Sequence, residues 1–259
     1  SNPVINSAFQ VWQRGTSFTA TSGYTADRWY VNHGVAGRTV SRQVTGDTTN
    51  LPFIQYALRY QRDSGNTNTA NNSILYQSFE SVNSIPLAGK TVTMSFYARA
   101  GANYSAASGR LGVYLISGTG TDQNYGVGYT GAAFPINNGT ATLTTTWQRF
   151  TFSGTVAATA TELTTYFEST PVGTAGANDY FEVTGVQLDI GSVALPFRTT
   201  AATIQGELAA AQRYYETGAA AIWSGNTTSG SNYYLNVPFA VVKRTSTPTI
   251  TLVTTGVNG

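Results

Sequence analysis

The sequence contains no cysteine, a single histidine and unusually few charged residues. The absence of cysteine excludes disulfide bonds and thiolate metal sites. Charged residues make up 10% of the chain, whereas about 25% is typical of soluble domains. Thr, Ser, Asn, Gln and Gly take their place, and this mixture suits β-strands with a neutral outer face joined by turns. It is poor material for long helices.

Positive charge is also scarce and scattered along the 259 residues. The net charge is +2, only two lysines occur, and Lys and Arg form no cluster. Because nucleic-acid binding needs a dense basic stripe, we expect no nucleic-acid partner. No apolar run approaches the roughly 18 residues of a membrane-spanning helix, and no signal peptide is apparent, so we expect no membrane insertion. The chain starts at Ser1 rather than Met, so we expect a processed chain or an excised fragment.

Alternating apolar and polar residues predict a series of β-strands in residues 1–199. The clearest pattern is at residues 91–99, where four apolar side chains fall on one face. Turns containing Gly, Asn and Pro separate the strands at regular spacing, which is typical of an antiparallel sandwich or jelly roll. Residues 117–138 are rich in Gly, Asn and Tyr and are predicted to be loops. The predicted strands cover residues 27–31, 38–44, 53–61, 74–79, 91–99, 111–116, 146–153, 162–168 and 179–190.

The pattern changes at residues 200–218, which predict a short connecting helix. Four residues recur at steps of four, three and four and so share one helical face: Ile204, Leu208, Ala211 and Tyr215. Thr203 can cap the start of this helix and Gly218 can end it. So short a helix must dock on another surface. Its apolar face fits packing on the chain's own sandwich, and it equally fits a two-heptad oligomer interface between subunits.

The last segment, residues 219–259, predicts the start of a distal β domain. Strands are expected at residues 233–242 and 249–254. Because two or three short strands are marginal alone, either a partner chain completes their sheet or the natural chain continues. We therefore predict three parts: a jelly-roll domain at 1–199, a connecting and oligomerisation helix at 200–218, and the start of a distal β domain at 219–259.

No catalytic motif stands out. The only histidine, His33, lies in an Asn-His-Gly stretch that predicts a solvent-exposed turn rather than a member of a catalytic triad. Glycoside hydrolysis needs only two carboxylates, but no spacing among the acids singles out a pair. For Asp27, Glu182 and Asp189 we favour structural hydrogen bonds or pairing with arginine over a calcium site. We therefore predict a protein that is not an enzyme and has no cofactor, with a structural calcium ion as the minority alternative.

Aromatic residues give the strongest indication of binding. Sixteen Tyr and four Trp are many for so few charges. Three tryptophans alternate with apolar neighbours and are predicted core residues: Trp12, Trp29 and Trp147. Tyr104, Tyr125 and Tyr129 lie in polar, glycine-rich stretches, and loop tyrosines offer a large contact area at low entropy cost. They are candidates for carbohydrate binding by stacking on sugar rings, and equally for covering loops or lining a subunit contact.

Three stretches resemble a known family when taken together. The first is VINSAFQVWQRG at 4–15 followed by YTADRW at 24–29, the second is KTVTMSFYAR at 90–99, and the third is GVQLDIGSVALPF at 185–197 followed by QRYY at 212–215. As a set they resemble bacteriophage tail fibres and related prophage tail proteins that carry a carbohydrate-binding-module-like jelly roll. The end of the chain, VPF at 237–239 and KRTSTPT at 243–249, is similar to the start of the distal β domain in such proteins.

This resemblance implies a structural and receptor-binding component of a phage tail fibre or tail tip. Such a protein is commonly a homotrimer, contacts other virion tail proteins and attaches the virion to a polysaccharide (the host surface glycan). It folds in the host cytoplasm and is extracellular, on the virion, after release. The resemblance implies no catalytic residues.

The resemblance also bears on metal binding and on the alternatives. Jelly rolls of this kind often hold a structural calcium near the first strand, where an acid follows Asn-x-x-Phe, but here Gln10 follows Phe9. Two other functions stay open: a carbohydrate-binding module of a secreted glycoside hydrolase, and a tailspike depolymerase.

Overall fold

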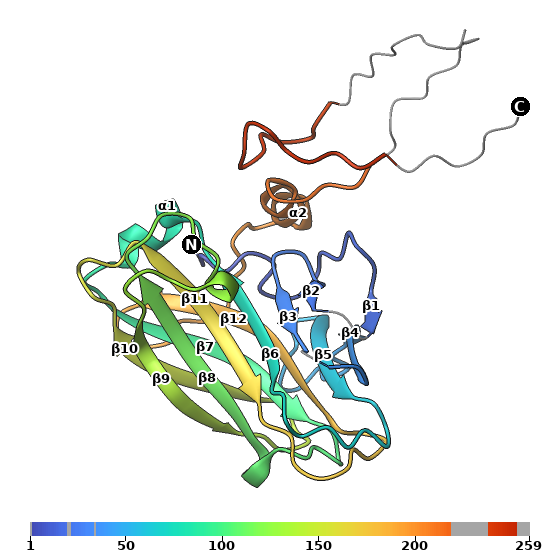
Figure 1. Ribbon diagram of the computed structural model, residues 1–259. Coiled ribbons are helices and arrows are strands. Elements are labelled where there is room, and N and C mark those ends of the chain that lie inside the picture. The colour runs from blue at the N-terminus through green and yellow to red at the C-terminus, as the bar shows by residue number, and fades with distance from the viewer. Residues whose placement is uncertain (1, 20–21, 34, 219–237, 253–259) are drawn as a thin grey trace, which may run out of the picture.

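The computed structural model describes residues 2–19, 22–33, 35–218 and 238–252. Two six-stranded antiparallel sheets face each other and form a sandwich (Figure 1), which confirms the predicted all-β antiparallel fold. In spatial order, the first sheet contains β1 (Ser17–Thr19), β4 (Arg38–Val44), β5 (Tyr56–Arg62), β12 (Tyr180–Ile190), β7 (Thr91–Ala100) and β10 (Gln148–Thr155). The second contains β2 (Gly23–Tyr24), β3 (Tyr30–Asn32), β6 (Ser73–Ser78), β11 (Glu162–Ser169), β8 (Arg110–Gly118) and β9 (Ala133–Thr142).

Helices are short and lie at the ends of the sandwich. The connections hold α1 (Ser81–Ser84) and the 3-10 turns η1 (Ile85–Leu87), η2 (Ala107–Gly109) and η3 (Tyr125–Val127). A longer helix, α2 (Ile204–Gln212), lies outside the two sheets, at the end of the sandwich near the N-terminus (Figure 1). No described helix is long and apolar enough to cross a membrane.

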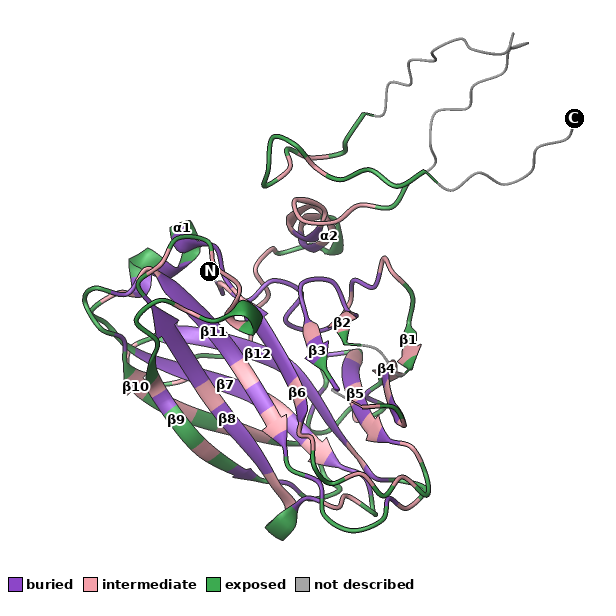
Figure 2. Ribbon diagram, in the orientation of Figure 1, coloured by how far each residue is buried: buried purple, intermediate pink, exposed green. Residues whose placement is uncertain are grey.

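The core forms where the inner faces of the two sheets meet. On β7 the four alternating residues Val92, Met94, Phe96 and Ala98 are fully buried. Phe96 reaches across to the second sheet, where its ring centroid lies 4.8 Å from that of Phe167. Burial of one such side chain stabilises the fold by ~1.5–3 kcal/mol. Figure 2 shows that buried positions follow the strands of both sheets.

The three tryptophans predicted for the core are all buried. Trp29 is fully buried and Trp12 is 8% exposed, and both belong to the main core. Trp147 belongs to a second, smaller apolar cluster with Ile54 and Ala57. The alternating sequence pattern therefore identified them correctly.

Two strands differ from their predictions. Residues 117–138 were expected to be loops, yet residues 133–138 belong to β9 (133–142) at the edge of the second sheet. This strand buries only Ile136 and Ala141, and its pairing with β8 is irregular near Asn138, which has φ of 55°. Its sequence alternation is therefore weak. The strand expected at 27–31 starts only at Tyr30, because Arg28 adopts φ of 73° and interrupts the extended backbone.

The acids singled out in the sequence have structural partners. Glu182 is fully buried, and its two oxygens lie 2.6 Å from Nη2 of Arg59 and 2.5 Å from Nε of Arg99. Asp189 pairs with Arg198 at 2.7 Å. Asp27 accepts a hydrogen bond from the backbone N–H of residue 13 at 2.9 Å. Structural pairing, the favoured interpretation, is therefore confirmed for these carboxylates.

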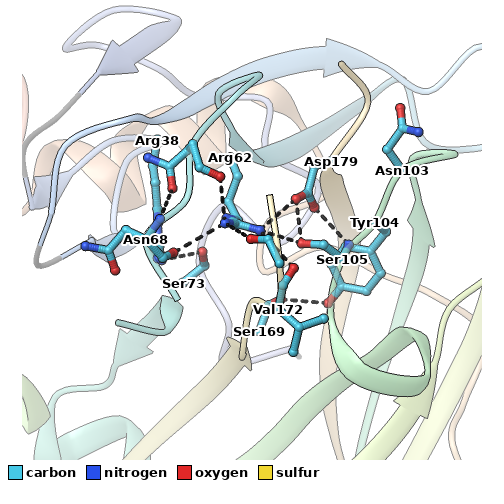
Figure 3. A network of polar contacts seen from close by, with 12 residues as sticks. Arg38, Arg62, Asn68, Ser73, Asn103, Tyr104, Ser105, Ser169, Val172 and Asp179 are labelled. Atoms are coloured by element: carbon cyan, nitrogen blue, oxygen red, sulfur yellow. Dashed lines mark hydrogen bonds and ion pairs between the residues drawn. The ribbon is translucent and has the colours of Figure 1, made fainter. Parts of the chain in front are cut away.

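A buried arginine holds together the loops at the end of the sandwich opposite α2. The guanidinium of Arg62 lies 3.1 Å from Asp179 and donates to Ser105 Oγ at 2.7 Å (Figure 3). It also donates to the carbonyl oxygens of Asn66 and Gly173, both at 2.9 Å. These acceptors come from three separate loops, so one side chain fixes all three.

The predicted helix is present but shorter than expected. Thr203 caps it, because its Oγ1 accepts a hydrogen bond from the backbone N–H of Gly206 at 3.2 Å. The carboxylate of Glu207 accepts from the backbone N–H of Asn6 at 2.9 Å and ties the first turn to the N-terminal segment. The helix ends at Gln212 and not near Gly218. Beyond its end, the ring of Tyr214 packs against Arg28 and the ring of Tyr215 against Arg14.

The strands predicted after the helix are not found in the described residues. Residues 238–242 and 249–252 contain no strand, and the remainder of the two predicted strands lies outside the described residues. Residues 240–244 instead lie against the residues that come directly after α2. Lys243 pairs with Glu216, and the backbone N–H of Arg244 donates to the carbonyl oxygen of Arg213 at 3.0 Å.

Candidate functional site: a row of tyrosines on the second sheet

The outer face of the second sheet carries one tyrosine on each of five neighbouring strands. These five residues are named the tyrosine row: Tyr24 of β2, Tyr30 of β3, Tyr76 of β6, Tyr166 of β11 and Tyr114 of β8. The register places each of them directly opposite the tyrosine of the next strand. Their neighbours along the strands, such as Val31 and Phe167, are fully buried between the sheets. Because successive side chains of a strand point to opposite faces, the tyrosines point outward.

The rings of the row form one continuous contact. Tyr30 and Tyr76 are stacked at 5.2 Å between centroids, and Tyr76 and Tyr166 at 6.1 Å. At the two ends, Tyr24 meets Tyr30 edge-on at 5.2 Å, and Tyr114 meets Tyr166 edge-on at 5.5 Å. Four of the five are half-buried, while Tyr76 is 4% exposed. The row crosses four strand-to-strand spacings, so it is ~19 Å long.

Two of the tyrosines predicted from the sequence stand over this row. Tyr125 lies on η3 in the β8–β9 connection, and its ring meets Tyr76 edge-on at 6.4 Å and Tyr166 at 5.7 Å. Tyr129 lies 5.5 Å from Tyr125. The β8–β9 connection therefore adds an aromatic wall beside the middle of the row.

Buried polar contacts hold this connection in place. The Tyr129 hydroxyl donates to the carbonyl oxygen of Leu163 at 3.1 Å. Oε1 of Glu162 accepts from the backbone N–H of Gln123 at 3.0 Å and from Ser81 Oγ at 3.1 Å. Burial raises the pKa of Glu162 above its ordinary value. Glu162 is fully buried, so it anchors the loop and is not available to a ligand.

The row carries no charge at neutral pH. Burial raises the pKa of Tyr76 and Tyr166 well above that of a free phenol, and their tyrosine neighbours add to the shift. Burial also raises the pKa of Tyr129 to about 12. The face is therefore a neutral aromatic surface with hydroxyl groups at its edges, and such surfaces combine apolar contact with hydrogen bonding.

Polar side chains flank the row. The Tyr114 hydroxyl lies 2.7 Å from Oε1 of Glu168 and 2.9 Å from Oδ1 of Asn138. In the middle, Oδ1 of Asn124 accepts from the Tyr76 hydroxyl at 3.1 Å. A ligand on the row would thus meet carboxylate and amide groups suited to neutral hydroxyls.

The third predicted tyrosine, Tyr104, lies away from the row. Its ring packs against the main core, 6.3 Å from Phe181, and its hydroxyl lies 2.9 Å from the carbonyl oxygen of Arg110 and from Ser169 Oγ. These contacts commit Tyr104 to the interior of the sandwich. The structure therefore brings together only two of the three tyrosines predicted from loop composition.

The residues predicted to share one helical face have different surroundings. Ala211 is buried, and the ring of Tyr215 lies 3.4 Å below the guanidinium carbon of Arg14, in the chain's own N-terminal segment. Leu208 is half-buried and Ile204 is 47% exposed. The first two contacts are within the chain, which is one of the two alternatives, and an interface between subunits stays a prediction.

The prediction for His33 was wrong. The residue is 1% exposed, and its Nδ1 lies 2.6 Å from the hydroxyl of Tyr60, another buried residue. The Asn-His-Gly composition indicated a turn but not what packs over it. Among the described residues, no group of three or more His, Asp or Glu side chains could hold a metal ion.

Sequence reasoning missed the row itself. Tyr30, Tyr76, Tyr114 and Tyr166 each occupy an outward position in a strand, and that common position was a readable signal. Their alignment was not readable, because β6 ends at Ser78 and its partner β11 begins only at Glu162, far along the sequence. Composition pointed to loop tyrosines, whereas the sheet register assembles strand tyrosines.

Comparisons with known proteins were made for sequence and structure. No family model matches the sequence, and no curated protein matches it. Among solved structures, the chain is similar to the enzymatically active domain of bacteriophage CBA120 tailspike protein 4, with 12% identity and a TM-score of 0.46. This match covers 73% of the present chain but only 21% of that chain.

Two carbohydrate-binding modules are similar over nearly their whole length. A structure titled "CBM4 structure and function" matches with 18% identity and a TM-score of 0.44, covering 72% of the present chain and 98% of that one. The CBM22-1 xylan-binding domain of Paenibacillus barcinonensis Xyn10C matches with 16% identity and a TM-score of 0.40, covering 69% and 94%. The similarity is one of β-sandwich architecture, and function must be argued from the side chains of this chain.

Proposed function

We propose that this protein binds glycan chains through the tyrosine row. The observation that carries the proposal is the direct register of five outward tyrosines on five neighbouring strands. Half-buried tyrosines present rigid, amphipathic contact area at low entropy cost. Sugar rings have apolar C–H faces and polar edges, so they match a surface whose rings are apolar and whose rim is polar.

The dimensions and polarity of the row favour an extended sugar chain. Its length of ~19 Å exceeds that of one ring, so several units could lie along it. Tyr166 is the fourth of the five residues and contacts Tyr76, Tyr114 and Tyr125. Its hydroxyl has no hydrogen-bond partner among the described residues and so can bond to a sugar hydroxyl. The binding face is preformed, which lowers the entropic cost of binding.

The placement of acids favours binding over hydrolysis. In the described part of the chain, Glu168 is the one carboxylate bonded to a tyrosine of the row. Glu162 lies six residues earlier on the same strand, ~20 Å away, and is buried. Glycosidases need two carboxyl groups about 5–9.5 Å apart across the scissile bond. We therefore propose a binding protein without enzymatic activity.

We further propose that the glycan is a polysaccharide of a bacterial surface and that the chain belongs to a phage tail fibre or tail tip. The sequence stretches at 4–15, 90–99 and 185–197 support this context. A homotrimer on the virion, with other tail proteins as partners, is part of the same proposal. A stable monomer with full sugar binding would instead favour a module of a secreted glycoside hydrolase.

Glycan-array binding followed by titration tests the role of the row. Tyr166→Ala should weaken binding of an array-positive oligosaccharide by roughly 10- to 100-fold, because a half-buried aromatic contact inside the row is lost. Tyr166→Phe keeps the ring and should retain most of the affinity. Tyr180→Ala is the matched control, since Tyr180 is also half-buried but lies on the first sheet, stacked on Arg59.

Two results decide the test. If Tyr166→Ala binds the oligosaccharide as tightly as the unmodified protein, and a thermal unfolding curve shows that the variant is folded, the row is not the site. Release of reducing sugar from the bound polysaccharide, abolished by a single Asp or Glu substitution, would overturn the non-enzymatic part of the proposal.

A further inference from the structure

A cavity of about 250 Å³ lies at one end of the tyrosine row. Its lining residues come from the N-terminal segment, β2, the end of α2 and residues 243–248. Of these, α2 and residues 243–248 lie beyond the two sheets (Figure 1). Tyr24, the last residue of the row, lines this cavity as well. A chain lying along the row would therefore reach the cavity at Tyr24.

The cavity is cationic. Five basic side chains line it: Arg14, Arg28, Arg213, Lys243 and Arg244. Three acids neutralise part of this charge. Asp27 lies 3.8 Å from Arg14, Glu80 lies 3.1 Å from Arg213, and Glu216 pairs with Lys243. Glu80 also lies 3.9 Å from Arg244, so among the described residues Arg28 is the one basic side chain of the five without an acid within 4.0 Å. In a chain with so few charges, five basic side chains around one cavity are a marked local concentration.

Arg28 is the central group of this charge. It is 8% exposed, and no carboxylate lies within 4.0 Å of it among the described residues. One terminal nitrogen donates to the carbonyl oxygen of Ser78, while its buried Nε has no hydrogen-bond partner among the described residues. Its guanidinium carbon lies 3.6 Å from the centroid of the Tyr214 ring. A buried cation without an anion is unfavourable unless some group compensates it.

The backbone and a second arginine indicate that this arrangement is built in. Arg28 has φ of 73°, a left-handed conformation that is uncommon for a residue other than glycine and is often found at functional sites. Arg14 stacks 3.4 Å above Tyr215 on the same wall of the cavity. Burial lowers the pKa of Arg14, so an added anion would stabilise its charged form. Arginine forks also match the oxygens of carboxylate and phosphate groups.

We propose that this cavity binds an oxyanion substituent, a carboxylate or a phosphate, on the glycan that lies along the tyrosine row. This inference rests on the proposed glycan-binding function and narrows the ligand to an acidic polysaccharide. The acidic group would sit beside Tyr24 and contact Arg28 and Arg14. Neutral units of the same chain would stack on the half-buried tyrosines of the row, Tyr30, Tyr166 and Tyr114.

The first experiment tests the cavity without the row. Sodium glucuronate, inorganic phosphate and neutral glucose are titrated separately into the intact protein, and the arginine Nε–H signals are followed by NMR. Glucuronate or phosphate should shift the Arg28 and Arg14 signals saturably, and glucose should not. In Arg28→Gln the saturable shift of the remaining Arg14 signal should be lost or strongly weakened. Comparison of the two anions distinguishes a carboxylate site from a phosphate site. Absence of a saturable shift with both anions overturns the proposal.

The second experiment joins the cavity to the row. An acidic polysaccharide and its carboxyl-reduced, neutral form are compared as ligands. The acidic form should bind roughly 10- to 100-fold more tightly, because charge-assisted hydrogen bonds are added, and Arg28→Gln should remove this preference. Because Arg28 is buried, Arg14→Gln is a second variant that perturbs the fold less. Arg42→Gln, on the first sheet against Tyr56, is the matched control.

The outcomes separate the two proposals. Equal binding of both polysaccharide forms, or a preference that survives both arginine variants, overturns the anion site while leaving the tyrosine row intact. Binding of the acidic form that is lost in Arg28→Gln but unchanged in Tyr166→Ala supports the anion site and overturns the row.

Discussion

The buried Arg62 offers a quantitative test of how the sandwich is held together. Its side chain is 4% exposed and lies 3.1 Å from Asp179, which is 3% exposed. Arg62→Met keeps much of the apolar stem but removes the guanidinium. Asp179 then retains hydrogen bonds from the backbone N–H and the hydroxyl of Ser105, but its charge stays buried without a cation.

The magnitude follows from this geometry. Removal of one partner of a buried ion pair costs about 3–5 kcal/mol, mainly because the other charge is left uncompensated. For a chain of this size, 1 kcal/mol corresponds to about 2–4 °C in Tm. Arg62→Met should therefore lower Tm by roughly 6–20 °C. The variant should still fold, because typical stabilities are about 5–15 kcal/mol.

Calorimetry and urea unfolding of a double-mutant cycle check the reasoning. Asp179→Asn in the Arg62→Met background removes the stranded charge, so the double variant should be more stable than the sum of the single effects by about 1–3 kcal/mol. Arg42→Met is the control. Because Arg42 has no carboxylate within 4.0 Å among the described residues, this substitution should lower the free energy of unfolding by about 1 kcal/mol or less. A loss below ~1 kcal/mol for Arg62→Met, or strict additivity, would refute the account.

Two further predictions concern α2 and the residues after it. Thr203→Ala removes the capping oxygen and should destabilise α2 by about 1 kcal/mol, seen as faster amide hydrogen exchange in residues 204–212 with the β-strands unchanged; uniform exchange changes would contradict a local cap. Burial opposes ionisation of Glu80, but hydrogen bonds from Arg213 and Tyr214 outweigh it and lower its pKa, and the hydrogen bond from Lys243 lowers the pKa of Glu216. Glu216 pairs with Lys243, and Glu80 also lies 3.9 Å from Arg244. Both groups therefore stabilise the docking of residues 240–244 above their ordinary pKa of 4.5, and this contribution is lost as pH falls through the lowered values. Hydrogen exchange in that segment should accelerate below about pH 4, whereas constant protection from pH 7 to pH 3 would show that these pairs do not hold it.

Local pattern determined much of the fold. Alternation at residues 91–99 and 38–44 gave strands close to the observed ones, because side chains of a strand point alternately to its two faces. The strand predicted at 179–190 is also close to the observed β12. The cap at Thr203 was equally readable, since its geometry depends on residues only three positions away. Prediction was poorest at β9, an edge strand that buries two side chains and so carries little pattern.

The site required the tertiary structure. The sequence alone showed a chain rich in Tyr and Thr, poor in charge and without cysteine, and hence predicted a β protein with a largely neutral surface. Whether a given tyrosine would be buried like Tyr104 or aligned like Tyr166 depended on which strands pair, and pairing joins residues far apart in the chain. The same holds for Arg28, whose surroundings come from the N-terminal segment, β6 and the residues after α2. Sequence composition set the kind of surface, and long-range strand register decided where that surface lies.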